Sequence, residues 1–143
     1  MVRILTIILI LLLSQNCLSQ ITKYEDYEIT KTEAIKQNKS ILIILTGSEW
    51  CKPCVKMKKN VFSNPDFVSL LENNFVIFEI NLQRYFDMDS KLYKNYRFFQ
   101  DKYSSNALPS IIVLDKNENL KKVITKNLTS FGKTYEALQS LTR

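Results

Sequence analysis

Apolar and polar residues alternate along this 143-residue chain in blocks that predict strands and helices in turn. Short apolar runs rich in β-branched residues predict buried strands at 41–45, 75–82 and 111–114. A polar turn follows the third run and leads to a predicted edge strand at 120–125. Helical spacing and helix-starting residues predict helices that begin near Thr30, Cys51, Pro65, Ser90 and Ser130. Helices that alternate with strands predict an α/β fold whose sheet is covered on both faces.

Two of these helices have defined start signals. Thr30 followed by Glu33 matches a capping box, which predicts a helix from Thr30 to about Asn38. Ser63 or Asn64 in front of Pro65 predicts the start of a shorter helix, because proline suits the first helical position.

The predicted helix at 90–103 lies in a segment rich in aromatic residues. One set falls at helical spacing and predicts a buried face: Leu92, Tyr96, Phe99 and Tyr103. A second set does not share that face: Tyr85, Phe86, Tyr93 and Phe98. The second set forms either a surface that recognises a partner or covers the cysteines, or the outer side of an extended helix.

The N-terminal segment has the order of a secretory signal. A positive start precedes an apolar core at 4–13 and a polar, small-residue exit at 14–19. An apolar run of this length is too short to cross a bilayer as a helix, which takes roughly 20 residues. We therefore expect a signal peptide at 1–19, a single domain at 20–143, a periplasmic location and no stable membrane span after signal removal. The alternative is lipid attachment at Cys17.

The formal net charge of the chain is +6, and its lysines are scattered rather than grouped in one block. This distribution predicts a solvated basic surface, and we expect no nucleic-acid partner. Attraction to acidic protein or membrane surfaces stays open.

Trp50-Cys51-Lys52-Pro53-Cys54 is the motif that carries chemistry. It places two thiols one helical turn apart, directly after a predicted buried strand. A helix that starts near Cys51 would favour the thiolate of this residue through its exposed N–H groups and its dipole. Pro53 suits the first helical turn, and Lys52 adds a nearby positive charge. The motif therefore predicts a reversible dithiol and disulfide.

Other uses of two nearby cysteines are less compatible with the composition. A structural zinc site needs four Cys or His ligands, but the chain has three cysteines and no histidine. A c-type haem site needs histidine after Cys54, where the sequence has Val55. We expect no metal and no cofactor. An inert structural disulfide between Cys51 and Cys54 remains the alternative.

With these residues in view, the chain resembles the thioredoxin family. The resemblance is carried by the segments 38–40, 46–54 and 61–67, and by Ala107-Leu108-Pro109-Ser110 followed by residues 111–115. More narrowly, the chain is similar to exported thioredoxin-like proteins whose domain resembles the C-terminal domain of bacterial transmembrane disulfide reductases. The resemblance implies a thioredoxin fold, with a central mixed sheet flanked by helices on both faces.

The resemblance also implies a role for each site residue. Cys51 is the attacking thiolate and Cys54 the resolving thiol. Trp50 is a flat cover beside them, and Pro109 is a cis proline that faces the sulfurs. The backbone of Leu108 is then presented to a substrate strand. The alternatives are an ordinary proline at a strand start for Pro109 and core filling for Trp50.

Lys52 and Pro53, between the two cysteines, complete the expected substrate-binding set. One position departs from thioredoxin: the buried acid that precedes the first cysteine by six residues is replaced by Leu45. Glu79, on the neighbouring predicted strand, is the candidate that takes over proton transfer, with Glu49 as a more exposed substitute. The alternative for Glu79 is a surface carboxylate.

Three functional classes follow from these residues. The favoured one is a thiol-disulfide oxidoreductase that reduces client protein disulfides, or relays electrons for cytochrome maturation, and is restored by an upstream thiol reductant. The second is a disulfide oxidase or isomerase that uses the same cysteines. The third is a non-enzymatic binding module in which the disulfide only stabilises a loop.

Overall fold

The computed structural model describes residues 21–142 of the chain, which build a five-stranded mixed sheet. The strands are β1 (Lys23–Tyr24), β2 (Ser40–Thr46), β3 (Phe75–Asn81), β4 (Ser110–Leu114) and β5 (Leu120–Ile124). Their order across the sheet is β1-β3-β2-β4-β5. β1 and β2 run parallel to β3, whereas β4 is antiparallel to both of its neighbours, β2 and β5.

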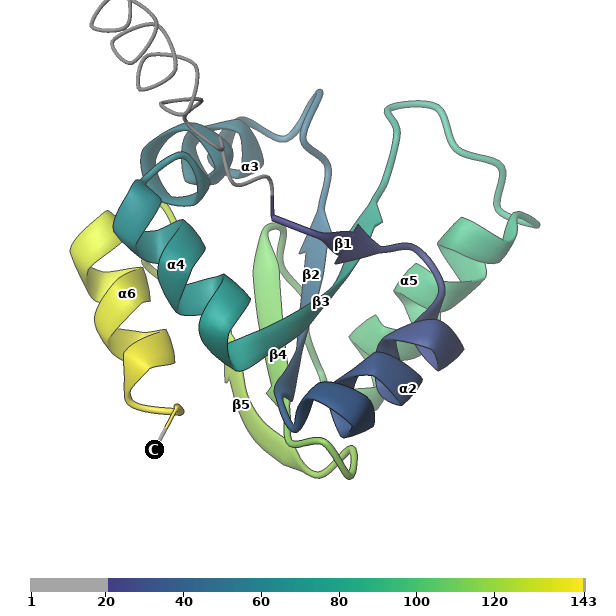
Figure 1. Cartoon of the computed structure of the whole chain (residues 1–143). Coiled ribbons are helices and arrows are strands. Elements are labelled where there is room, and N and C mark those ends of the chain that lie inside the picture. The colour runs from purple at the N-terminus through teal and green to yellow at the C-terminus, as the bar shows by residue number, and fades with distance from the viewer. Residues whose placement is uncertain (1–20, 143) are drawn as a thin grey trace, which may run out of the picture.

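Helices cover both faces of this sheet (Figure 1). They are α2 (Tyr27–Gln37), α3 (Lys52–Met57) with the π-helical turn η1 (Lys58–Phe62), α4 (Pro65–Asn74), α5 (Lys91–Lys102) and α6 (Phe131–Gln139). α3, α4 and α6 lie on one face, and α2 and α5 lie on the other. The connection from β2 to α3 and the long connection from β3 to α5 leave the same end of the sheet.

The apolar run at 41–45 is continuous rather than alternating because it forms β2, the central strand of the sheet. Leu42 and Ile44 belong to the core on the side of α3, α4 and α6. Ile41, Ile43 and Leu45 belong to the core on the side of α2 and α5. All five side chains are fully buried, because successive residues of a strand point to opposite faces and both faces are covered.

The predicted fold class and the four predicted strands are confirmed, each strand to within one residue at either end. The helix starts near Pro65, Ser90 and Ser130 are confirmed as well. The sequence did not predict β1, since two residues with one exposed lysine give no period to detect.

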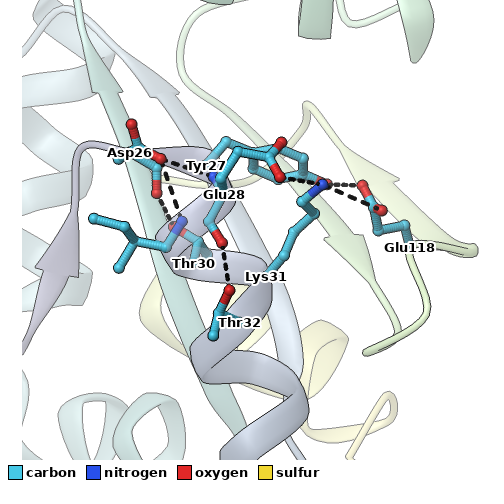
Figure 2. Close-up of polar contacts among 8 residues, drawn as sticks. Asp26, Tyr27, Glu28, Thr30, Lys31, Thr32 and Glu118 are labelled. Atoms are coloured by element: carbon cyan, nitrogen blue, oxygen red, sulfur yellow. Dashed lines mark hydrogen bonds and ion pairs between the residues drawn. The ribbon is translucent and has the colours of Figure 1, made fainter.

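The predicted start of the first helix was wrong. α2 begins at Tyr27 rather than Thr30, because the Asp26 carboxylate accepts hydrogen bonds from the N–H groups of Glu28 and Ile29 (Figure 2). Thr30 lies inside the helix and donates its hydroxyl hydrogen to the carbonyl of Asp26. The hydrogen bond from Ile29 is the main cause that lowers the pKa of Asp26.

Glu118, in the turn before β5, ties that turn to the start of α2 (Figure 2). It accepts a hydrogen bond of 2.9 Å from the Tyr27 hydroxyl and forms an ion pair with Lys31 at 3.8 Å. Burial is the main cause that raises the pKa of Tyr27, and the hydrogen bond to Glu118 is the next largest cause. This contact lies over α2 and takes no part in the site described below.

The buried and exposed side chains of the aromatic segment are not the two sets that the sequence predicted. Tyr96 and Phe99 are buried as predicted, but Leu92 is 38% exposed. Tyr93 takes its place as the partly buried side chain and stacks on Phe86 at 4.8 Å between ring centroids. The other outward aromatics are not one surface. Tyr85 is exposed in the β3–α5 connection, whereas Phe98 lines a separate hollow beside α2.

Candidate active site

The cysteine pair sits where the chain leaves β2 and enters α3. Cys51 is the N-cap of α3, and Cys54 lies in its first turn. The two are joined by a disulfide with a Cα–Cα distance of 5.2 Å. The N–H of Cys54 donates to Cys51 Sγ at 3.3 Å. The sulfur of Cys51 therefore occupies the capping position, where helix N–H groups favour a negative charge.

The two cysteines differ in their burial. The Cys51 residue is 7% exposed, whereas Cys54 is fully buried. Lys52 and Pro53, between them, are both exposed. A reagent or client disulfide can therefore approach this pair from the side of Cys51.

Trp50 is held in place at the rim of the pair. Its indole N–H donates to the carbonyl of Leu82 at 2.9 Å, and its ring packs against the same core cluster as Leu108 does. Gly47 makes room for this ring: a Cβ on Gly47 would lie 2.7 Å from Trp50 Cε2. The half-buried ring thus depends on the absence of a side chain three residues earlier.

A second connection between this loop and β3 was missed by the sequence analysis. The N–H of Ser48 donates to Asn81 Oδ1 at 2.9 Å, and Asn81 Nδ2 donates to the Ser48 hydroxyl at 2.6 Å. Asn81 is the last residue of β3, and a polar residue at the end of an apolar strand was the available signal. The pair fixes the loop before Cys51 to the neighbouring strand.

The segment before β4 brings the proline to this end of the sheet. The Leu108–Pro109 peptide bond is cis, and Pro109 is buried directly before β4. The hydroxyl of Ser105 donates to Ser110 at 2.6 Å, and both serines are fully buried. Leu108 shares a core cluster with Trp50, so the proline turn and the cysteine loop pack on the same cluster.

Glu79 lies on a different face of the sheet from the residue it was expected to replace. It pairs in register with Ile44, which places its side chain on the face of α3, whereas Leu45 belongs to the opposite cluster. Both of its carboxylate oxygens accept hydrogen bonds from Lys23, at 2.8 and 2.9 Å. Glu79 and the exposed Glu49 line one open hollow of about 540 Å³.

Residues 21–142 hold neither a cluster of metal ligands nor a helix that could cross a membrane. No group of three or more His, Cys, Asp or Glu side chains gathers there as metal ligands would. None of the helices in this part of the chain has the length and apolar character to span a membrane.

A disulfide at a helix start and a cis proline directly before a strand, on a mixed sheet covered by helices, define a thioredoxin-fold protein with a disulfide-capable cysteine pair. The family described as "Thioredoxin-like domain" matches residues 27–126, and the chain belongs to this family. With its Cys51–Cys54 pair the chain is a thioredoxin-like oxidoreductase. The predicted family and enzyme class are confirmed.

Known proteins are similar to the chain in sequence or in fold. The thioredoxin-related protein DsbJ of Chlamydia pneumoniae is 26% identical over 93 residues, which are 65% of this chain and 27% of that protein. The chain thus matches about a quarter of the length of this relative. The structure of a DsbH oxidoreductase aligns with a TM-score of 0.69 at 15% identity, over 88% of this chain and 90% of the other. The DsbD C-terminal domain of Neisseria meningitidis, in its oxidised form, aligns with a TM-score of 0.60 at 10% identity, over 85% of this chain and 100% of the other.

Proposed function

We propose that this chain is an exported protein-disulfide reductase that acts through Cys51 and Cys54. The observation that carries the proposal is the asymmetry of the pair: Cys51, at the start of α3, keeps 7% of its surface exposed, whereas Cys54 is fully buried. The first suits attack on a large client, and the second suits an intramolecular step that no client can reach.

The proposed reaction is thiol-disulfide exchange in two steps. The Cys51 thiolate attacks one sulfur of a client disulfide, which forms a mixed disulfide and releases the other client sulfur as a thiolate that takes up a proton. The thiol of Cys54 loses its proton and attacks Cys51, which releases the second client thiolate. Two electrons have then passed to the client, and an upstream thiol reductant must reduce the Cys51–Cys54 disulfide again.

The residues around the pair would hold the client. In this proposal a client strand pairs with the backbone of Leu108, which the cis bond to Pro109 orients. The Trp50 ring supplies a flat apolar contact, anchored through Leu82. The exposed Lys52 and Pro53 complete the contact surface.

The site of action is proposed to be the bacterial periplasm. The expectation rests on the signal-like sequence at 1–19, which lies outside the described residues, as does Cys17, the alternative point of lipid attachment. The relative DsbJ is named a thioredoxin-related protein. The clients that we propose for this chain are exported proteins that contain disulfides.

The reduction potential tests the direction of electron flow. We expect a value near that of thioredoxin, about −270 mV, because tryptophan precedes the first cysteine and proline the second, as in a thioredoxin-like site. Equilibration with glutathione or dithiothreitol buffers, followed by thiol trapping, measures it. A value near about −120 mV would instead favour the oxidase or isomerase, and a pair that never exchanges with dithiols would favour the binding module.

We further propose that Glu79 accepts the proton of Cys54 in the second step, since Leu45 cannot. Its side chain lies on the face of the sheet that α3 covers, although in the oxidised structure it is engaged by Lys23. Glu79 would therefore act from the α3 side, after release from Lys23, rather than from the position of the missing acid.

Glu79→Gln should slow the second step by about 10²-fold at neutral pH and flatten its pH dependence, because amide groups cannot accept the proton. Stopped-flow measurement of Trp50 fluorescence during single-turnover exchange reports this step. Glu25→Gln is the matched control, since Glu25 lines the same hollow, and Glu49→Gln tests the substitute. An unchanged pH profile in Glu79→Gln would remove Glu79 from the mechanism.

A further inference from the structure

A row of lysines covers the outer side of the helical segment that begins at the dithiol. Lys52, Lys56 and Lys59 are exposed and recur at intervals of four and three residues, which puts them on one side of the helix. The opposite side, with Cys54 and Met57, is buried. We call Lys52, Lys56 and Lys59 the basic helix face.

The charge of this face is not balanced by neighbouring carboxylates. Between Glu49 and Asp66 the sequence has four lysines, Lys58 being the fourth, and no acidic residue. None of the ion pairs formed within residues 21–142 involves these four lysines. Val55, in the middle of the segment, adds an apolar side chain that is 44% exposed.

Elsewhere in residues 21–142 some cations form ion pairs, whereas others, such as Lys122 and Lys126 on and after β5, form none. Ion pairs link Lys23 with Glu79, Lys31 with Glu28 and Glu118, Lys36 with Glu33, Lys91 with Asp26, and Arg97 with Asp101. The helices α2 and α5 thus mix both signs of charge, whereas the helical segment that starts at Cys51 carries one sign. An unbalanced charge of one sign at a reactive group favours a partner of the opposite sign.

We propose that the basic helix face selects client proteins whose attacked disulfide is flanked by aspartate or glutamate; this inference rests on the reductase function proposed above. A client sulfur must come within bonding distance of Cys51, which begins the same helical segment. Carboxylates a few residues from that client cysteine then come to lie over Lys56 and Lys59. Because these lysines are exposed, their main effect is on the rate of encounter, and salt screens it.

The test compares two disulfide-linked peptides of equal length, one with aspartate and one with serine beside the cysteines. The protein, purified in its exported form and reduced beforehand, transfers one electron pair per turnover, which yields two peptide thiols and the Cys51–Cys54 disulfide. At low ionic strength we expect the wild type to reduce the acidic peptide faster. Lys56→Glu combined with Lys59→Glu should lower that rate about tenfold and leave the serine peptide nearly unchanged.

Lys52 is left intact in this test because it lies between the cysteines and acts on their chemistry. The matched control is Lys122→Glu with Lys126→Glu, which makes the same change in net charge at exposed positions on and after β5. We expect the control to retain the preference for the acidic peptide. High salt should abolish the preference in the wild type, since the Debye length falls from about 30 Å at 0.01 M to about 3 Å at 1 M.

Several outcomes would overturn the inference. They are equal rates for both peptides in the wild type, and an equal loss of rate in the control variant. A third is binding of phosphatidylserine vesicles that depends on Lys56 and Lys59 without any preference between the peptides, which would make the face a membrane contact. Failure of the wild type to reduce either peptide would overturn the reductase function itself, and the inference with it.

Discussion

Cys54→Ser is expected to convert the protein from a catalyst into a trap. Cys51 remains at the start of α3 and attacks client disulfides, but no second sulfur is present to release the client. The mixed disulfide then persists, and turnover in a disulfide-reduction assay falls to the uncatalysed background. Non-reducing electrophoresis followed by mass spectrometry of the trapped species measures this result and identifies the clients.

The paired variant, Cys51→Ser, keeps the buried sulfur and loses the accessible one. We expect neither turnover nor trapped clients, because Cys54 is fully buried and cannot reach a disulfide in another protein. Circular dichroism verifies that both variants are folded. If Cys51→Ser trapped clients as well as Cys54→Ser does, the assignment of attacking and resolving sulfurs would be wrong.

Gly47→Ala is expected to disturb the active-site rim far more than its size suggests. The new methyl group would lie 2.7 Å from the Trp50 ring, which is rigid and anchored to Leu82, so the ring must move and its hydrogen bond must weaken. Overpacking of this kind costs about 1 to 3 kcal/mol in the free energy of unfolding. Denaturant titration measures that loss, and the fluorescence of Trp50, the single tryptophan, reports the displacement.

Gly132→Ala is the matched control for that substitution. Gly132 is near the start of α6, and a Cβ there meets no atom within 4 Å. Alanine should therefore leave stability unchanged or raise it by about 0.5 kcal/mol through helix propensity. If Gly47→Ala proved as harmless as Gly132→Ala, the glycine would not be needed for the position of Trp50.

The sequence was sufficient for the parts of the fold that bury continuous apolar surface. The run at 41–45 predicted a strand covered on both faces, and its residues divide between the two cores of the structure. The start of α2 was harder to predict because two capping signals compete. Thr30 and Glu33 formed the better sequence match, but Asp26 is the residue in extended conformation at the helix entrance.

The site was predicted where its residues are adjacent in the sequence and missed where they meet across strands. Cys51 and Cys54 could be placed from their spacing and neighbours alone. The contacts of Ser48 with Asn81 and of Trp50 with Leu82 depend on the register of β2 against β3, which no local pattern encodes. For Glu79, the sequence predicted a neighbouring strand but did not reveal which side of it the carboxylate would take.

The complete burial of Cys54 has a consequence for how the proposed reductase would protect its reducing equivalents. Of the two cysteines in residues 21–142, only Cys51 is open to small oxidants and alkylating agents, so Cys54 stays protected until Cys51 has formed a covalent bond. In the proposed reductase, electrons therefore leave through Cys51, and they leave as a pair only after a client has bound covalently to it. Alkylation of the reduced, native protein should accordingly label Cys51 well before Cys54.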